Sequence, residues 1–198
     1  ADAEFDIVWR TIGVPGVLGR LEPKPTYWQD EIDHVIKGRG ITQWDDYAEL
    51  SRTGRLRGLN LEQRRAVWEL FTAYQARMLA RGAHDEADII LLADQSLAEH
   101  PDPRYGAVVV DEAQDLSAAM LRMLYRLVGD KPDGITLIGD YKQSIYPGGY
   151  TLAEADVSIA GRGVVMTRNY RNTAEIAEFA ALSVTGDDVD EAVCEPAA

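Results

Sequence analysis

Two adjacent carboxylates, Asp111 and Glu112, stand directly after the apolar run 108–110. Such a run is typical of a buried parallel strand, and ligands of open α/β folds bind at the carboxyl ends of these strands. There, one carboxylate can join the shell of a Mg²⁺ ion, usually through water, while its neighbour positions or deprotonates an attacking water molecule. An acidic residue at a strand end can equally cap the next helix, so the pair alone leaves both interpretations open.

Two further segments carry polar side chains after short apolar runs, and they contain Asp140 with Gln143 and Tyr170 with Arg171. An amide such as Gln143 can contact a phosphate oxygen and lose that contact after hydrolysis. An aromatic ring can stack on adenine, and a guanidinium can neutralise charge that builds on a γ-phosphate. The alternatives are an ordinary turn glutamine at Gln143 and a structural ion pair at Arg171.

The three segments read DEAQD at 111–115, GDYKQSIY at 139–146 and NYRNT at 169–173. In this order they resemble helicase motifs II, III and IV of the UvrD/Rep/PcrA group of superfamily 1 DNA helicases. The resemblance is strong from about residue 105 onward and looser before it. It implies an ATP hydrolase that uses ATP and Mg²⁺, moves 3′ to 5′ on DNA, and takes part in DNA repair.

The resemblance also implies roles for individual side chains. Asp111 belongs to the Mg²⁺ shell, and Glu112 is the catalytic base for ATP hydrolysis. Gln143 senses the γ-phosphate, Tyr170 stacks on adenine, and Arg171 acts as an arginine finger. We therefore expect Glu112, Gln143 and Arg171 to be catalytic, and Asp111, Gln143, Tyr170 and Arg171 to bind ATP and its metal ion.

The chain departs from the family pattern in two places. It holds no G-x-x-x-x-G-K-[ST], the phosphate-binding loop of such enzymes. After the second motif, better-known members carry a tryptophan that stacks on a DNA base, whereas this chain continues with 147–150, where Tyr150 is the candidate substitute. We therefore expect a piece of a larger helicase that does not hydrolyse ATP by itself.

Composition limits the setting in which the chain works. It has 198 residues, 46% of them hydrophobic, and a formal net charge of −13. This charge argues against bulk coating of nucleic acid but allows a narrow track for one DNA strand. The resemblance implies that the partner is single-stranded DNA or a single/double-strand junction. The single cysteine, Cys194, cannot form an internal disulfide, and no apolar run approaches the ~20 residues of a membrane span. A cytoplasmic location is predicted.

Hydrophobic periodicity changes along the chain. Before the break at 100–103 the pattern is helical, most clearly at 61–79 and from about 85 onward. After the break it alternates between strand and helix, which is typical of a parallel α/β sheet. The elements expected there are strands at 107–110, 135–138 and 163–166, a helix at 116–128 and a final helix from about 173.

The periodicity predicts an α/β fold, and the resemblance implies a partial RecA-like parallel sheet of the P-loop NTPase type with a mostly helical N-terminal insertion subdomain. Residues 1–104 would form the insertion of the first motor domain. Residues 105–166 would form the C-terminal half of that domain, and 167–198 the start of the second motor domain with an acidic tail.

Other features leave alternatives open. Five arginines, which are Arg52, Arg55, Arg57, Arg64 and Arg65, would either contact DNA phosphates or line a solvated helix face. Asp115 is expected to cap a helix or to link motifs, and the four tryptophans are expected to pack in the interior. A degenerate helicase-like scaffold without ATPase activity is the alternative function. A metal-dependent nuclease built on Asp111, Glu112 and Asp140 is a third.

Overall fold

The computed structural model describes residues 1–52, 55, 57–102, 104–129, 131–140, 152–155, 157–158, 161–166, 173, 175–176 and 178–179. The chain divides into two units, residues 1–157 and 158–198, which are described separately. Gln143, Tyr150, Tyr170, Arg171 and the acidic tail lie outside the described residues. The predicted boundaries at 104/105 and 166/167 stay predictions.

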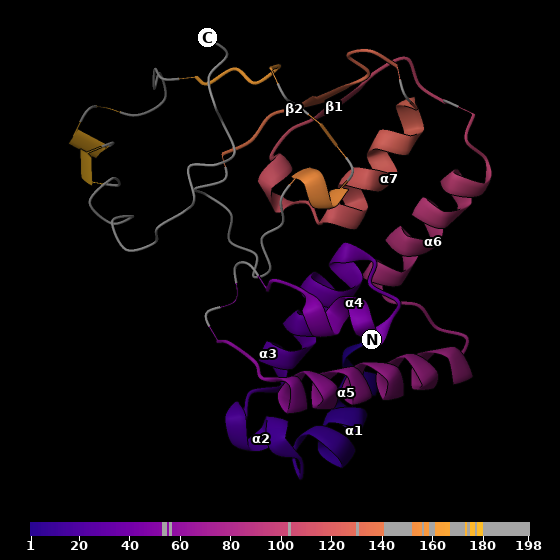
Figure 1. Ribbon diagram of the computed structural model, residues 1–198, viewed down its shortest axis with the longest axis vertical. Coiled ribbons are helices and arrows are strands. Elements are labelled where there is room, and N and C mark those ends of the chain that lie inside the picture. The colour runs from indigo at the N-terminus through magenta and orange to yellow at the C-terminus, as the bar shows by residue number, and fades with distance from the viewer. Residues whose placement is uncertain are drawn as a thin grey trace. The chain divides into compact units, whose positions relative to one another are not determined.

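The first half of the chain is helical, and its helices α1 to α5 lie together in the lower part of Figure 1. Their shared core includes Trp28, Ile32, Tyr47 and Leu70, each with no exposed surface. The elements are α1 (Asp2–Val8), the π-helix η1 (Trp9–Gly13), α2 (Val17–Leu21), α3 (Pro25–Asp30), the π-helix η2 (Glu31–Ile36), the 3₁₀-helix η3 (Lys37–Arg39), α4 (Trp44–Glu49) and α5 (Leu61–Ala80). As predicted, all four tryptophans belong to this core or pack against it.

The two longest helices begin at reciprocal side-chain caps. Asn60 and Gln63 cap α5 by exchanging hydrogen bonds with each other's backbone N–H groups. Asp85 and Asp88 do the same for α6 (Glu86–Glu99). Such caps satisfy backbone donors that a helix start leaves without partners. The predictions of a helix at 61–79 and of another from about 85 to the proline-rich break are confirmed.

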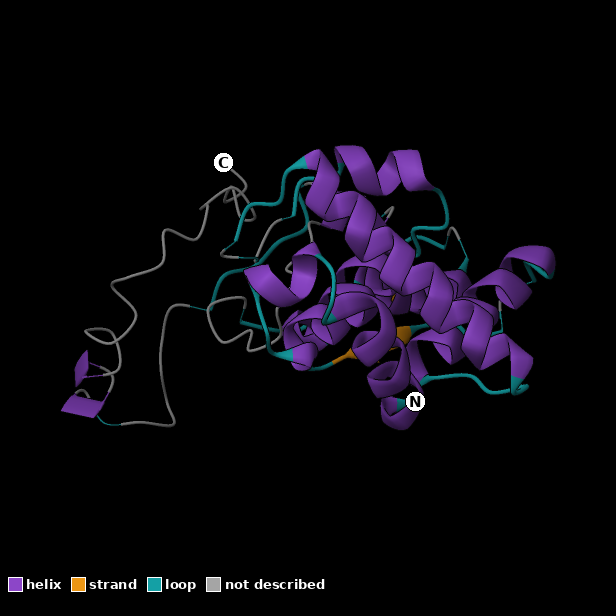
Figure 2. Ribbon diagram, turned by 90° about the horizontal axis from the view of Figure 1, so that it is seen from below, coloured by secondary structure: helices purple, strands orange, loops and turns teal. Residues whose placement is uncertain are grey.

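The second half of the first unit alternates between strand and helix. Strand β1 (Val108–Val110) and strand β2 (Ile135–Leu137) are parallel, with Val108 opposite Ile135. Helix α7 (Ala118–Val128) connects them, and the 3₁₀-helices η4 (Ala113–Asp115) and η6 (Leu152–Ala155) complete the unit. Figure 2 shows how small this sheet is beside the helices. The parallel α/β alternation is confirmed, while the RecA-like assignment stays a prediction.

Helix α7 covers one face of the strand pair. Val110 on β1 is buried, as are Leu121 and Val128 on α7, whereas Val109 is 69% exposed on the opposite face. Strand neighbours point to opposite faces, so this alternation follows from the pleat. The covered face holds the strand ends in place, and therefore also the loops that follow them.

Two details of the sequence-based assignment are wrong. Residues 163–166 form no strand, and Val164, Val165 and Met166 are exposed. A strand is stabilised by a hydrogen-bonded neighbour, and the sheet of the described residues consists of β1 and β2. Helix α7 begins at Ala118 because Ser117 accepts the hydrogen bond of the Met120 N–H at 3.2 Å. Asp115 is therefore not its cap.

Ionic contacts join α6 to α7. Asp94 on α6 is buried, and its two carboxylate oxygens accept hydrogen bonds from Arg122 Nε at 2.9 Å and Arg126 Nε at 2.6 Å. A second pair links the helical part to the end of the unit, where Arg39 Nε lies 2.7 Å from Glu154 Oε2. These contacts fix the helix that supports the strands against the helices before it.

Candidate functional site

The carboxylates after β1 occupy an unusual backbone position. Glu112 adopts a left-handed conformation with φ 52° and ψ 43°, and the side chains of Asp111 and Glu112 are exposed. A non-glycine residue in this conformation costs on the order of 1–3 kcal/mol, and such positions gather at functional sites. The Glu112 N–H donates to Asp111 Oδ1 at 3.0 Å. The turn therefore presents both carboxylates at the end of the strand.

A buried glutamine contacts one of these carboxylates and the loop after β2. Gln114 is only 6% exposed. Its Nε2 donates to Glu112 Oε2 at 2.7 Å, and its Oε1 accepts from the Asp140 N–H at 3.0 Å. The sequence alone assigns no firm role to Gln114. Its spacing from Glu112 gives no sign that one side chain reaches both loops.

Backbone contacts lock the same two loops together. The Ile138 N–H donates to the Val110 carbonyl at 2.8 Å, and the Ala113 N–H donates to the Ile138 carbonyl at 2.9 Å. A Cβ atom at Gly139 would stand 2.5 Å from Gln114 Oε1, so this loop passes too close to Gln114 for a side chain. The loop after β1 and the loop after β2 thus form one packed unit.

The structure brings three of the acidic residues considered above, Asp111, Glu112 and Asp140, to the same end of the strand pair. In the described part of the chain, no group of three or more His, Cys, Asp or Glu side chains has the arrangement of a metal site. Asp111, Glu112 and Asp140 therefore do not form such a group. Mg²⁺ in nucleotide sites needs less, since one or two carboxylates, water and substrate phosphates usually hold it. A single exposed Asp111 fits that requirement.

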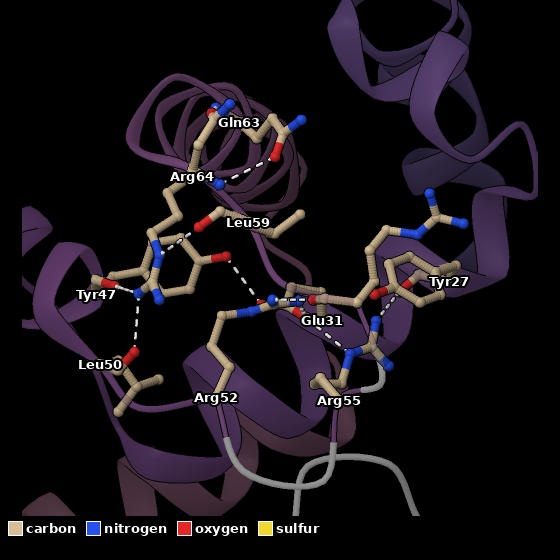
Figure 3. A network of polar contacts seen from close by, with 11 residues as sticks. Tyr27, Glu31, Tyr47, Leu50, Arg52, Arg55, Leu59, Gln63 and Arg64 are labelled. Carbon is tan, nitrogen blue, oxygen red and sulfur yellow. Dashed lines mark hydrogen bonds and ion pairs between the residues drawn. The ribbon is translucent and has the colours of Figure 1, made fainter.

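Two of the five arginines, Arg52 and Arg55, turn inward, whereas Arg57 and Arg65 are exposed. Glu31 is fully buried at its centre, as Figure 3 shows. Arg52 donates to both carboxylate oxygens, from Nε at 2.6 Å and from Nη2 at 2.7 Å, and Arg55 Nε lies 2.8 Å from Oε2. The Tyr47 hydroxyl donates to Oε1 at 2.9 Å. Neither phosphate contact nor a solvated face describes Arg52 and Arg55, because their side chains are buried.

The burial of this cluster changes its acid–base chemistry. Desolvation and then the negative charge of Glu31 raise the pKa of the Tyr47 hydroxyl. Burial opposes the charge of Arg52, but the hydrogen bonds and charge of Glu31 outweigh it and raise the pKa of the guanidinium. Arg64 donates to the carbonyls of Tyr47 and Leu50 at 2.7 and 2.9 Å. The charged groups of this cluster therefore hold neighbouring helical segments together.

A second polar cluster joins η3 to α5 and α6. Lys37 is buried and pairs with Asp85 and with Asp88, the latter at 2.8 Å. The Tyr74 hydroxyl donates to Asp85 at 2.9 Å. Burial, followed by the charge of Asp85, raises the pKa of nearby Asp33 to about 7. The sequence alone does not reveal this cluster, because Lys37 and its partners are far apart in the chain.

Comparison with known proteins identifies the family of the chain. Residues 41–157 match the model of the UvrD/REP helicase N-terminal domain, which is more than half of the chain. The chain therefore belongs to the UvrD/REP helicase family. The match includes Asp111, Glu112, Gln114 and Asp140, and it ends before Tyr170 and Arg171.

Similar proteins include helicases from bacteria. The chain is 35% identical to the ATP-dependent DNA helicase UvrD1 of Mycobacterium tuberculosis over 130 residues, 57% of this chain and 17% of that protein. It is 32% identical to UvrD2 of the same organism over 135 residues, 62% of this chain and 19% of UvrD2. It is 27% identical to the exonuclease/helicase protein RexA of Lactococcus lactis over 130 residues, 57% and 10% of the two chains. The chain thus matches less than a fifth of the length of these relatives.

None of the helices in the described part of the chain combines the length and the apolar character that a membrane crossing requires.

Proposed function

We propose that this chain is the part of an ATP-dependent DNA helicase that supplies the metal-binding carboxylate and the catalytic base for ATP hydrolysis. The observation that carries the proposal is the packed unit of the loops after β1 and β2, which presents Asp111 and Glu112 at the end of a parallel strand. This unit lies inside the UvrD/REP match, and several relatives are named ATP-dependent DNA helicases.

In the proposed reaction Asp111 would help to hold Mg²⁺, which would supply positive charge to the phosphates. Glu112 accepts a proton from the water molecule that attacks the γ-phosphate. Its exposed carboxylate is open to that water, while the left-handed turn and Gln114 fix its direction. Gln143 as sensor, Tyr170 on adenine and Arg171 as finger complete the proposal on the strength of the motifs.

DNA is the proposed partner, as a single strand or a junction, and 3′-to-5′ movement follows from the same resemblance. Arg52 and Arg55 are not proposed to contact DNA, because both are buried and paired with Glu31. The single Cys194 agrees with a cytoplasmic setting, which stays a prediction. The scaffold alternative has less support, because several of the similar proteins are named as ATP-dependent enzymes.

A chimera tests the proposal. The segment of M. tuberculosis UvrD1 that corresponds to the family match at residues 41–157 is replaced by these residues of this chain. We expect DNA-stimulated ATP hydrolysis, and Glu112→Gln in the chimera should lower kcat by about 10²-fold or more, because an amide cannot accept the proton. Glu69→Gln, at an exposed position of α5, is the matched control and should leave kcat unchanged.

The outcomes separate the two functions. A chimera that folds, as judged by circular dichroism and cooperative melting, but hydrolyses no ATP would support the scaffold. Equal activity of the Glu112→Gln and Glu69→Gln chimeras would remove Glu112 as the base. The 198-residue chain alone should show no DNA-stimulated hydrolysis, because its sequence holds no phosphate-binding loop.

A further inference from the structure

The Gln114 side chain connects the proposed catalytic base to the loop after β2. One end of its amide group donates to Glu112 Oε2 at 2.7 Å, and the other accepts from the Asp140 N–H at 3.0 Å. The residue itself is 6% exposed, so little water competes for either hydrogen bond. A single rigid amide therefore spans the two loops.

Two hydrogen bonds of Gln114 are enough to fix the orientation of its amide. The Asp140 backbone N–H can only donate, so it must face the amide oxygen. The NH₂ group then points at the Glu112 carboxylate, which can only accept while it is ionised. A flip of the amide would place donor against donor and acceptor against acceptor. The chemistry of the partners thus fixes the link.

The surroundings leave the link little freedom to adjust. Gly139 passes so close that a Cβ atom would meet Gln114 Oε1 at 2.5 Å, and the Ala113 N–H holds the Ile138 carbonyl at 2.9 Å. Glu112 itself is held in the left-handed turn. A change in the hydrogen bonds of the Glu112 carboxylate should therefore alter the hydrogen bonds of the Gln114 amide and, through them, the Asp140 N–H.

We propose that Gln114 is a positioning residue that aims Glu112 and passes its hydrogen-bonding state to the loop that begins at Gly139. This loop leads along the chain to Gln143, the proposed γ-phosphate sensor. The catalytic meaning of the link rests on the proposed function, whereas the link itself concerns the folded chain alone. Gln114 would thus couple the base to Gly139 and Asp140 at the start of the motif at 139–146.

Two substitutions separate the halves of the link. Gln114→Met keeps the length of the side chain but removes both hydrogen bonds. Gln114→Glu keeps an oxygen for the Asp140 N–H but has no proton for Glu112 at neutral pH and repels its carboxylate. Glu112→Ala removes the acceptor at the other end of the link.

The experiment measures the Asp140 backbone amide in the ¹⁵N-labelled 198-residue chain by NMR and by hydrogen exchange. In Gln114→Met we expect its exchange to become about fivefold to tenfold faster, the loss of one modest hydrogen bond, while Gln114→Glu stays close to the native rate. Glu112→Ala should shift the Asp140 resonance in the native background and leave it unmoved in the Gln114→Met variant, which has lost both hydrogen bonds of the link. The Ile138 N–H, which bonds to the Val110 carbonyl, is the internal control for folding and should stay protected.

Each result supports or overturns the proposal. A shift of Asp140 by Glu112→Ala that survives in the Gln114→Met background would mean that the loops communicate through the backbone and not through the amide. If hydrogen exchange at the Asp140 amide is unchanged in a folded Gln114→Met chain, the hydrogen bond between Gln114 and the Asp140 N–H does not protect that amide. Should Gln114→Met not fold, Gln114→Leu is measured in its place, because it also removes both hydrogen bonds of the link.

The UvrD1 chimera supplies the catalytic readout. Gln114→Glu should lower kcat for ATP by about tenfold and leave KM within about twofold, since the amide aims the base and is not proposed to touch the nucleotide. A loss confined to KM would overturn the positioning role. An inactive chimera would count against the proposed function alone, because the NMR result does not depend on ATP.

Discussion

The cluster around Glu31 and the loops around Glu112 use the same side-chain chemistry in opposite ways. Glu31 is fully buried, and Arg52, Arg55 and Tyr47 contact its two oxygens. The Glu112 carboxylate is exposed, and a neutral amide rather than a cation contacts it. Buried charge that is fully paired holds a structure together, whereas an exposed carboxylate in a strained turn stays available to a ligand.

The largest expected effect comes from breaking the buried cluster. Glu31→Gln leaves two guanidiniums in the interior without their counter-charge, and we expect the free energy of unfolding to fall by about 3–5 kcal/mol. Thermal and denaturant unfolding of the chain measure it. Glu112→Gln is the matched change at the other region and should shift stability by less than about 1 kcal/mol. Similar losses for the two variants would contradict the contrast between the regions.

A smaller effect should follow from crowding the candidate site. Gly139→Ala forces a Cβ atom against Gln114 Oε1 and the Ala113 and Gln114 backbone nitrogens, so we expect a loss of about 1–3 kcal/mol. Gly106→Ala is the control, because nothing lies within 4 Å of a Cβ atom there. Chemical denaturation compares the two. If both cost the same, the packing of the two loops is not as close as the structure gives it.

The smallest effect concerns pH and the cluster around Lys37. The pKa of Asp33 rises from 3.8 to about 7, through burial and then the charge of Asp85. Its contribution to stability is fully present below pH 3.8, where both states hold the proton. As pH rises toward 7 the unfolded chain ionises first, so the contribution falls, and it is lost above about pH 7.

Asp33→Asn removes this dependence. The difference in unfolding free energy between the native chain and Asp33→Asn should change by on the order of 1–2 kcal/mol between acid and mildly alkaline pH, a figure that allows for partial exposure of Asp33. The difference isolates Asp33, because the lowered pKa values of Asp88 and His34 affect both proteins alike. A flat difference would mean that Asp33 titrates as an ordinary surface carboxylate.

Local patterns in the sequence anticipated much of the fold. The apolar stripe predicted α5, and the run 108–110 with its following acids predicted β1 and the carboxylates at its end. These elements were predictable because short-range periodicity and capping decide them. The run 163–166 had the same apolar character but is not a strand, since strand formation depends on a neighbour that local sequence cannot supply.

Contacts between distant residues were not predictable. Glu31 meets Arg52 across 21 positions, and Lys37 meets Asp85 across 48, so the arginines looked available to DNA until the fold paired them. Gln114 is near Glu112 in the chain, but its other partner, Asp140, is 26 positions away. Only the parallel pairing of β1 and β2 brings that backbone N–H within reach.

By itself, the sequence determined the family, the order of the motifs and the carboxylates at the end of the first strand, because these depend on residue type and short spacing. Only the tertiary structure decided which charged side chains are buried and paired inside the helical region and which are exposed at the strand ends. Burial and pairing set that division, and both depend on which distant segments the fold places in contact.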